Sequence, residues 1–314
     1  MTTRIIETRL CESCTIFAAD MSEADLSGAL FKGAQIFEAR FLNTNLVEAD
    51  LSDTRMQSTD MTGADLSQAN LHNAHLDMVW LNSANLTEAD LSDARINGHF
   101  SNANLSGADF TKTQIITANF TGSDLTNTDF TDASIAFVYF VNTDLRRANL
   151  RLAVFEAIIY DTRTQFPEEL SIPGLNLYLF APHSSVTGIR AYSLALADQD
   201  LTGLDIRRSR IRGDFSRAVL DEANFENTVA YLSVFTEASF VDARLCNARF
   251  LRTNLTAANL QGADIRGANL RRTVVDNANF RGAIYNADTK FPRGFDPAAA
   301  GAVLDETSDA CMRL

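Results

Sequence analysis

Two cysteines, Cys11 and Cys14, have the C-x-x-C spacing that proteins use for zinc binding or redox chemistry. A structural zinc site needs a second pair of ligands. The sequence contains four histidines, none of which form a pair at ligand spacing: His72, His75, His99 and His183. Cys14 also falls at a position where small residues recur throughout the chain. Packing in the core is therefore favoured over metal or redox chemistry.

Catalysis requires titratable groups that converge in a pocket. The sequence contains no Ser–His–Asp arrangement, phosphate-binding loop or metal signature. The one stretch irregular enough to host a site is residues 161–190, where His183 follows Pro182, and a solvated loop histidine is the simpler interpretation. We therefore expect a protein that is not an enzyme and that uses no cofactor or metal.

The elements that position these side chains are set by an internal repeat. Forty-nine apolar residues recur at a spacing of five, from Ile16 to Ile96, from Phe100 to Tyr160, and from Leu196 to Tyr285. The frame loses one residue before Phe100 and again before Phe215. A small residue precedes nearly every apolar position by two. Such a fixed period is typical of a repeat architecture.

A spacing of five fits neither a helix nor a flat strand, because it would scatter the apolar side chains around a helix or onto both faces of a strand. The pattern is explained if the chain turns about a right angle at each repeat. Four repeats then close a square coil of about twenty residues, with the large side chains inside and Ser, Thr, Gly, Asp and Asn at the corners. Stacked coils would be about 4.8 Å apart.

Units such as ADLSG (residues 24–28), ANLTE (84–88), ANLSG (103–107) and ANLQG (258–262) resemble the pentapeptide repeat proteins. The resemblance covers roughly residues 14–160 and 191–286. It implies the right-handed quadrilateral β-helix of that family, an all-β fold that agrees with the square coil. More distantly, it implies kinship with the family's quinolone-resistance members, which protect DNA gyrase and dimerise through their C-terminal ends.

The repeat predicts four segments: a first β-helix block with an N-terminal cap (1–160), an irregular cap, linker or loop (161–190), a second block (191–290), and a C-terminal cap and tail (291–314). Each block closes with a similar phrase, AIIYDTRTQFP at 157–167 and GAIYNADTKFP at 282–292. Aromatic residues in and after these phrases are expected to plug the coil stacks. Asp296 and Pro297 predict the start of a short C-terminal helix.

The acidity of the chain lies in the first block, where residues 1–160 hold 21 acidic and 10 basic residues. Reading the outward residue before each apolar position at coil spacing gives two adjacent acidic columns. Eight aspartates form this candidate acidic stripe: Asp25, Asp50, Asp65, Asp90, Asp109, Asp124, Asp129 and Asp144. A third column contains no acid: Gln35, Arg55, His75, Arg95, Gln114, Ser134 and Val154.

The stripe has two interpretations. Its net charge, spread over about 36 Å of stacked coils, approaches within a factor of about two the density of duplex DNA, which carries one charge per roughly 1.7 Å. A DNA mimic that binds basic protein surfaces is then physically possible. The alternative is that Asp and Asn at this position serve only the fold, through hydrogen bonds to nearby backbone.

Apolar residues at outward positions suggest a second contact surface. The candidate partner face contains five such residues: Met78, Trp80, Phe137, Tyr139 and Val141. In the second block, five arginines cluster between Arg207 and Arg217, where pairing with acids or with a partner is favoured over nucleic-acid binding because the block is nearly neutral.

These observations predict a non-catalytic protein-binding scaffold. Two functions remain open: a DNA-mimicking modulator or protector of a type II topoisomerase (DNA gyrase or topoisomerase IV), and a regulatory or assembly adaptor that binds a protein through the aromatic face. Direct nucleic-acid binding and membrane insertion are not expected, and a homodimer through the C-terminal end would follow from the resemblance. The sequence opens with no signal segment, which favours the cytoplasm.

Overall fold

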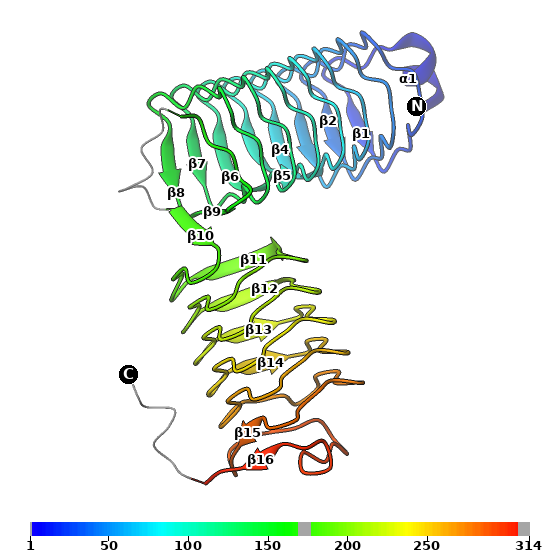
Figure 1. The fold of residues 1–314 in the computed structure, drawn as a ribbon. Helices are drawn as coiled ribbons and strands as arrows, with labels where there is room; N and C mark the ends of the chain where they lie inside the picture. Colours follow the sequence, from blue (N-terminus) through cyan, green and yellow to red (C-terminus); the bar gives the residue numbers. More distant parts are fainter. Residues whose placement is uncertain (1, 169–176, 307–314) are drawn as a thin grey trace. The chain divides into compact units, whose positions relative to one another are not determined.

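The computed structural model describes residues 2–168 and 177–306 and divides the chain into two compact units, Met1–Tyr178 and Leu179–Leu314. Each unit is a stack of β-coils (Figure 1). The elements, in chain order, are α1 (Thr2–Thr8), β1 (Thr15–Phe17), β2 (Gln35–Phe37), β3 (Arg55–Gln57), β4 (His75–Trp80), β5 (Arg95–His99), β6 (Gln114–Asn119), β7 (Ser134–Ala136), β8 (Val154–Glu156), β9 (Ile158–Asp161), β10 (Leu177–Phe180), β11 (Arg190–Ala195), β12 (Arg210–Asp214), β13 (Val229–Tyr231), β14 (Arg249–Leu251), β15 (Ile284–Tyr285) and β16 (Val303–Leu304).

All pairing that defines the coils is parallel. Strands β1 to β8 form one face of the first unit as an eight-stranded sheet, and β11 to β14 form a four-stranded sheet in the second. The other faces are joined by single bridges between residues one coil apart, such as Asn45 with Asp65. There Leu46 N–H donates to the Asp65 carbonyl at 2.7 Å, and Asp65 N–H donates to the Thr44 carbonyl at 2.9 Å. The predicted quadrilateral β-helix is confirmed.

The forty-nine apolar positions line the interior, as the repeat predicts. All but five of them are buried. The five that are only partly buried are Leu150, Phe155, Tyr160, Val275 and Tyr285. Phenylalanine rings stack from coil to coil, with centroids 4.9 Å apart for Phe100 and Phe120 and 4.7 Å for Phe110 and Phe130. Burial of this continuous column is the main source of stability, because each coil alone has no core.

The corners explain the polar part of the repeat. At each corner one residue adopts a left-handed backbone conformation, as Asn43 (φ 51°) and Gly63 (φ 70°) do on successive coils. Gly, Asn and Asp tolerate this conformation better than other residues. A corner can also carry a bulky residue, since Met78 (φ 50°) and Phe137 (φ 56°) occupy equivalent positions.

Both ends of the first unit are closed by side chains. At the N-terminal end, Ile5 of α1 is buried with the core, and Cys11 and Cys14 form a disulfide with their Cα atoms 5.3 Å apart. The sequence predicts core packing for this pair, and Cys11 is indeed buried, but the disulfide was not expected. At the other end, the rings of Tyr160 and Phe166 pack at 5.3 Å.

The second unit also has an aromatic plug, but the predicted C-terminal helix is wrong. The Phe280 and Phe295 rings pack at 4.9 Å. The Asp296 carboxylate accepts hydrogen bonds from two following N–H groups, as a helix cap would, yet the chain then forms only turns over residues 297–301. Gly301 takes a positive φ of 80°, and the next residues pair as β16 with β15. Strand pairing thus replaces further helical turns.

Within residues 2–168 and 177–306, no helix is long and apolar enough to cross a membrane.

Candidate functional site

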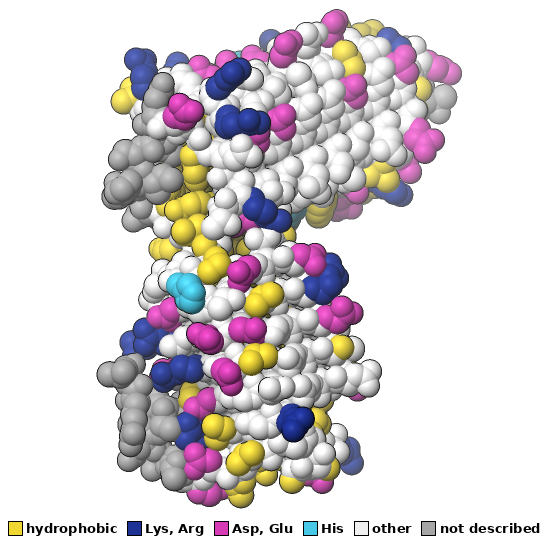
Figure 2. All heavy atoms as spheres, viewed as in Figure 1, with side chains coloured by type: hydrophobic (Ala, Val, Ile, Leu, Met, Phe, Trp, Pro, Cys, Tyr) yellow, Lys and Arg dark blue, Asp and Glu magenta, His cyan; other side chains and the backbone are white. Residues whose placement is uncertain are grey.

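The structure places the eight aspartates of the acidic stripe in two columns on neighbouring faces of the first unit. Parallel bridges connect the members of each column from coil to coil. The first column contains Asp25, Asn45, Asp65, Asn85, Asn104, Asp124 and Asp144, and the second contains Asp50, Asn70, Asp90, Asp109, Asp129 and Asn149. The columns continue in register across the short coil before Phe100. Acidic side chains also recur along the visible face of the first unit in Figure 2.

Local hydrogen bonds hold the stripe carboxylates in one orientation. The Asp65 Oδ1 atom accepts from Ser67 N–H at 3.0 Å and from the Ser67 hydroxyl at 2.8 Å. The Asn85 amide of the next coil donates to the same oxygen at 2.9 Å. All three hydrogen bonds end on Oδ1, so among the described residues the second carboxylate oxygen, Oδ2, is left for a partner. Asp90 has the same local arrangement with Ser92.

Such contacts favour the ionised form at three of the stripe aspartates, Asp25, Asp129 and Asp144. The hydrogen bond from the Ser27 hydroxyl is the main cause that lowers the pKa of Asp25. For Asp129, burial raises the pKa, but hydrogen bonds led by the one from Thr131 outweigh it and the net shift is downward. The hydrogen bond from Arg146 lowers the pKa of Asp144. Hydrogen bonds to a charged carboxylate favour that form, so the negative charge is retained at neutral pH.

Ion pairs neutralise the two ends of the stripe. Arg9 contacts Asp25 at 2.5 Å, and Arg146 contacts Asp144 at 2.6 Å. Among the residues that the structure describes, the six aspartates between these ends form no ion pair: Asp50, Asp65, Asp90, Asp109, Asp124 and Asp129. The middle of the stripe therefore presents carboxylates without a direct ion-pair partner among the described residues, although Arg151 is near enough to Asp129 to help lower its pKa.

The repeat that builds this surface matches a known family. Eight copies of the pentapeptide repeat profile align with the chain, and together they cover residues 17–151 and 214–284, more than half of the sequence. The chain belongs to the pentapeptide repeat family. In the structure, the repeats of this chain stack into a β-solenoid. No curated protein sequence matches the chain.

Several solved pentapeptide repeat structures resemble this one. A trypsin-treated variant of QnrB1, a plasmid-mediated fluoroquinolone resistance protein, shares 18% identity over 63% of this chain and 91% of that chain, with a TM-score of 0.33. HetL, involved in heterocyst differentiation regulation in Nostoc sp. strain PCC 7120, shares 19% identity over 88% and 89%, with a TM-score of 0.20. A protein of the Arabidopsis thaliana thylakoid lumen shares 29% identity over 32% and 68%, with a TM-score of 0.22. At such TM-scores the likeness is not evidence for a shared partner.

The predicted partner face of this pentapeptide repeat protein is only partly exposed. Met78, Trp80 and Phe137 are exposed to 45%, 37% and 49%. The expectation of exposure is wrong for Tyr139 and Val141, which are 9% and 0% exposed. A physical reason is visible in the neighbouring coils, because Tyr139 lies beside the apolar Ile159, whereas Trp80 lies between Asp60 and His99.

The closing coil contributes to that burial. Ile159 pairs with Tyr139 and is itself buried, at 5%. Leu177, which follows the closing coil, packs against the core of the first unit. The exposed part of the predicted partner face is therefore reduced to two corner residues, Met78 and Phe137, and to Trp80.

The arginine cluster of the second unit is partly neutralised, as the sequence favours. Arg207 forms an ion pair with Asp205 at 2.7 Å, and Arg217 forms one with Asp198 at 2.6 Å. These hydrogen bonds raise the pKa of both guanidinium groups. The remaining arginines of the cluster, Arg208, Arg210 and Arg212, are exposed.

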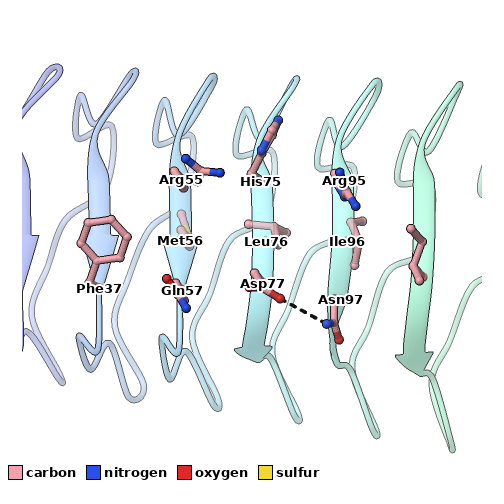
Figure 3. Close-up of a pocket in the computed structure, with 11 residues that line it drawn as sticks. Phe37, Arg55, Met56, Gln57, His75, Leu76, Asp77, Arg95, Ile96 and Asn97 are labelled. Atoms are coloured by element: carbon pink, nitrogen blue, oxygen red, sulfur yellow. Dashed lines mark hydrogen bonds between the residues drawn. The ribbon is translucent and has the colours of Figure 1, made fainter.

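A shallow groove that sequence reasoning missed lies on the eight-stranded sheet of the first unit. It has a volume of about 520 Å³ and runs across β2 to β6. In Figure 3, Arg55, His75 and Arg95 lie along one rim of the groove. The sequence identifies this rim as the column without acid, but not the opposite rim.

Neither the groove nor the stripe offers a metal centre. Across the described ranges, no group of three or more His, Cys, Asp or Glu side chains could hold a metal ion. His75 is in the groove, whereas His99 lies on another face, where burial lowers its pKa. What the described arrangement can do chemically is to bind other molecules through charge and hydrogen bonds.

Proposed function

We propose that this pentapeptide repeat protein is a non-catalytic, protein-binding scaffold whose acidic stripe occupies a basic surface built for duplex DNA. The partner that this chemistry suits is a type II topoisomerase, DNA gyrase or topoisomerase IV. The observation that carries the proposal is the run of six aspartates without ion pairs between Asp25 and Asp144, aligned in two neighbouring columns.

Spacing supports a mimic of duplex DNA. Successive coils are about 4.8 Å apart, and two columns contribute carboxylates along the same side of the unit. Duplex DNA carries one charge per roughly 1.7 Å along its axis. A basic groove that tracks phosphates could therefore pair with several stripe carboxylates at once, and the opposite charges would accelerate the encounter.

Rigidity supports the same function. Each stripe carboxylate that accepts bonds from the residue two positions later, as Asp109 does from Thr111 N–H at 2.8 Å, is already oriented before binding. Little side-chain entropy is then lost on association. The backbone beneath is a continuous ladder, so the charges keep fixed spacing when the partner binds.

Two assays test the proposal, each with and without a quinolone. One measures DNA supercoiling by purified gyrase, and the other measures decatenation by purified topoisomerase IV. We expect the wild-type protein to modulate the enzyme or to relieve quinolone inhibition. Replacing four stripe aspartates by asparagine should abolish the effect without harming the fold, since asparagine already occupies equivalent positions: Asp65→Asn, Asp90→Asn, Asp109→Asn and Asp124→Asn.

A matched control removes the same charge from exposed acids of the second unit: Glu222→Gln, Glu237→Gln, Asp242→Asn and Asp276→Asn. This variant should behave like the wild type. No effect of the wild-type protein on either enzyme would rule out the topoisomerase partner. Equal losses in the stripe variant and the control would show that the stripe is not the binding surface.

The second candidate function is a regulatory or assembly adaptor that binds a protein through the exposed apolar residues. The favouring observation is that Met78 and Phe137 take corner positions where polar residues are usual, and remain close to half exposed. Met78→Ser with Trp80→Ala should then abolish capture of a partner that the stripe variant still captures.

A homodimer through the C-terminal end belongs to the same set of proposals, and analytical ultracentrifugation of the full chain tests it.

A further inference from the structure

The basic rim of the groove is a row of side chains without ion pairs. Arg55, His75 and Arg95 are direct neighbours on β3, β4 and β5, paired Arg55 with His75 and His75 with Arg95. All three side chains are exposed, and within the described part of the chain none forms a salt bridge or a side-chain hydrogen bond. A row of basic residues without a single acid is unexpected in a unit whose net charge is strongly negative.

The opposite rim has different chemistry. Its middle is polar, since the Asp77 carboxylate accepts a hydrogen bond from the Asn97 amide at 3.1 Å, beside Gln57. Its two ends are apolar, with Phe37 at one end and Ile116, 39% exposed, at the other. Figure 3 shows this rim toward the other end of the strands from the basic row.

The floor between the rims is closed. The central residue of each strand, such as Leu76 between His75 and Asp77, points into the core, and the flanking residues point outward. The rims are therefore two residues apart along each strand, roughly 7 Å, which is more than the spacing of about 4.8 Å between neighbouring strands of a sheet. The strand N–H and C=O groups are used in the ladder, as when Arg95 N–H donates to the Ala74 carbonyl, so recognition depends on side chains.

We propose that this groove binds a short, extended, acidic peptide segment of another protein. The peptide would run across the strands, from β2 to β6, with its carboxylates toward the basic row. Four coil steps span about 19 Å, which corresponds to roughly six residues of an extended chain. Apolar side chains at the ends of the segment would contact Phe37 and Ile116, and its amide groups would bond with the polar middle of the other rim. This proposal concerns a different face from the acidic stripe and does not depend on the topoisomerase partner.

Charge favours a peptide over a nucleic acid. The basic row offers two guanidinium groups and one imidazole, whereas binding to a phosphate backbone requires many cations and, for single strands, aromatic platforms. The neighbouring face of the first unit carries Asp50, Asp90, Asp109 and Asp129. A long polyanion that extended past the groove would be repelled by these carboxylates. A short acidic segment would avoid them.

Fluorescence anisotropy of a labelled octapeptide that alternates glutamate and threonine, titrated with the full-length protein, tests the proposal. We expect binding that weakens with added salt, because the contacts are exposed charges. The double variant Arg55→Ala with Arg95→Ala should raise Kd about tenfold or more. The matched control, Arg147→Ala with Arg151→Ala, removes the same charge elsewhere in the first unit and should leave Kd unchanged.

A charge-swapped pair keeps the test decisive. Arg55→Glu with Arg95→Glu should reject the glutamate peptide and bind the equivalent lysine peptide. The proposal is overturned if the Arg55/Arg95 and Arg147/Arg151 alanine variants raise the peptide Kd equally, or if the wild-type protein does not bind the glutamate peptide. It is also overturned if single-stranded DNA of similar length binds the groove more tightly than the peptide. The circular dichroism spectrum of each variant should match the wild type, because every substituted side chain is exposed.

Discussion

Gly98 pairs with Val79 of the neighbouring strand so closely that a Cβ atom on Gly98 would lie 2.7 Å from the Val79 Cγ2 atom and 2.8 Å from the Val79 carbonyl oxygen. This contact occurs in the coil that is one residue short. Gly213 has the same relationship to Leu194 in the second unit, where a Cβ would lie 2.5 Å from the Leu194 carbonyl oxygen. A glycine at each short coil lets the backbone approach its neighbour.

The first prediction follows from this contact. Gly98→Ala should lower the free energy of unfolding by about 1–3 kcal/mol, because the added methyl group must displace backbone of the adjacent coil. Urea denaturation measures the change. Ser134→Ala, at an exposed position of the same sheet, is the control and should change stability by less than about 0.5 kcal/mol. Equal stability of the glycine variant and the wild type would contradict the close approach.

The second prediction concerns the aromatic column. Phe110 is fully buried, stacks with Phe130 at 4.7 Å and meets Phe120 edge to face at 6.3 Å. Phe110→Ala should therefore destabilise the protein by about 3–5 kcal/mol. Phe17→Ala, which truncates a side chain that is 65% exposed, should have little effect. Thermal denaturation of both variants compares interior and exterior directly, and similar melting temperatures would refute the assignment of the interior.

The third prediction concerns acid. Contacts in the folded state lower the pKa values of Asp25, Asp129 and Asp144 below the ordinary 3.8. A carboxyl group with a lowered folded pKa stabilises the fold above its unfolded pKa, and this stability is lost as pH falls through the folded value. We expect the melting temperature to be nearly constant from neutral pH to about pH 5 and to fall below about pH 4.

Asp144→Asn separates this contribution from general acid effects. The amide cannot be protonated in this range, so the variant should lose less stability between about pH 5 and pH 2 than the wild type does. Its stability at neutral pH should be lower, because the ion pair with Arg146 is lost. An unchanged pH profile in the variant would show that Asp144 does not contribute.

The fourth prediction concerns a buried cation. Arg266 is 5% exposed and forms ion pairs with Asp264 and, at 3.2 Å, with Asp305, which follows β16. Removing one partner of a buried pair costs about 3–5 kcal/mol. Arg266→Ala should therefore loosen the β15–β16 end, seen as faster amide exchange at Val303. Arg271 is exposed in the same unit, so Arg271→Ala should leave amide exchange unchanged. If the Val303 amide stayed as protected in the Arg266 variant as in the wild type, Arg266 would not hold the β15–β16 end.

Much of the fold is predictable because one period controls it. The interior positions, the four faces and the closing aromatics all follow from residue spacing, and the pairing of Asp90 with Asp109 confirms that the short coil still completes a full turn. Spacing is sufficient here because each coil contacts mainly its two neighbours, so local pattern and tertiary structure coincide.

Features at the ends of the units are less predictable, because the repeat no longer specifies them. Tyr139 has the spacing of an outward residue, but the chain after its coil covers it. The turn after Asp296 is cut short by pairing between β15 and β16, which competes with helix formation. The alanine-rich sequence after Pro297 favours a helix and does not indicate that competition.

The groove illustrates a different limit. Its basic rim is visible in the sequence as an acid-free column, but the opposite rim is formed by residues such as Asp77 and Asn97, which lie two positions after His75 and Arg95. The acidic columns and the basic rim both consist of the residue before each apolar position. Reading the residue after it at the same coil spacing could have revealed the second rim.

The parallel ladder, in which a residue is joined to one about twenty positions away, has a consequence for how such a chain can vary in length. Inserting a single five-residue unit would rotate everything downstream by a quarter turn and transfer the column of Asp90 and Asp109 onto the face that now carries Arg95. Inserting four units would lengthen the stack and preserve every alignment. Viable relatives of this protein should therefore differ by whole turns, or compensate a fractional change before the next surface begins.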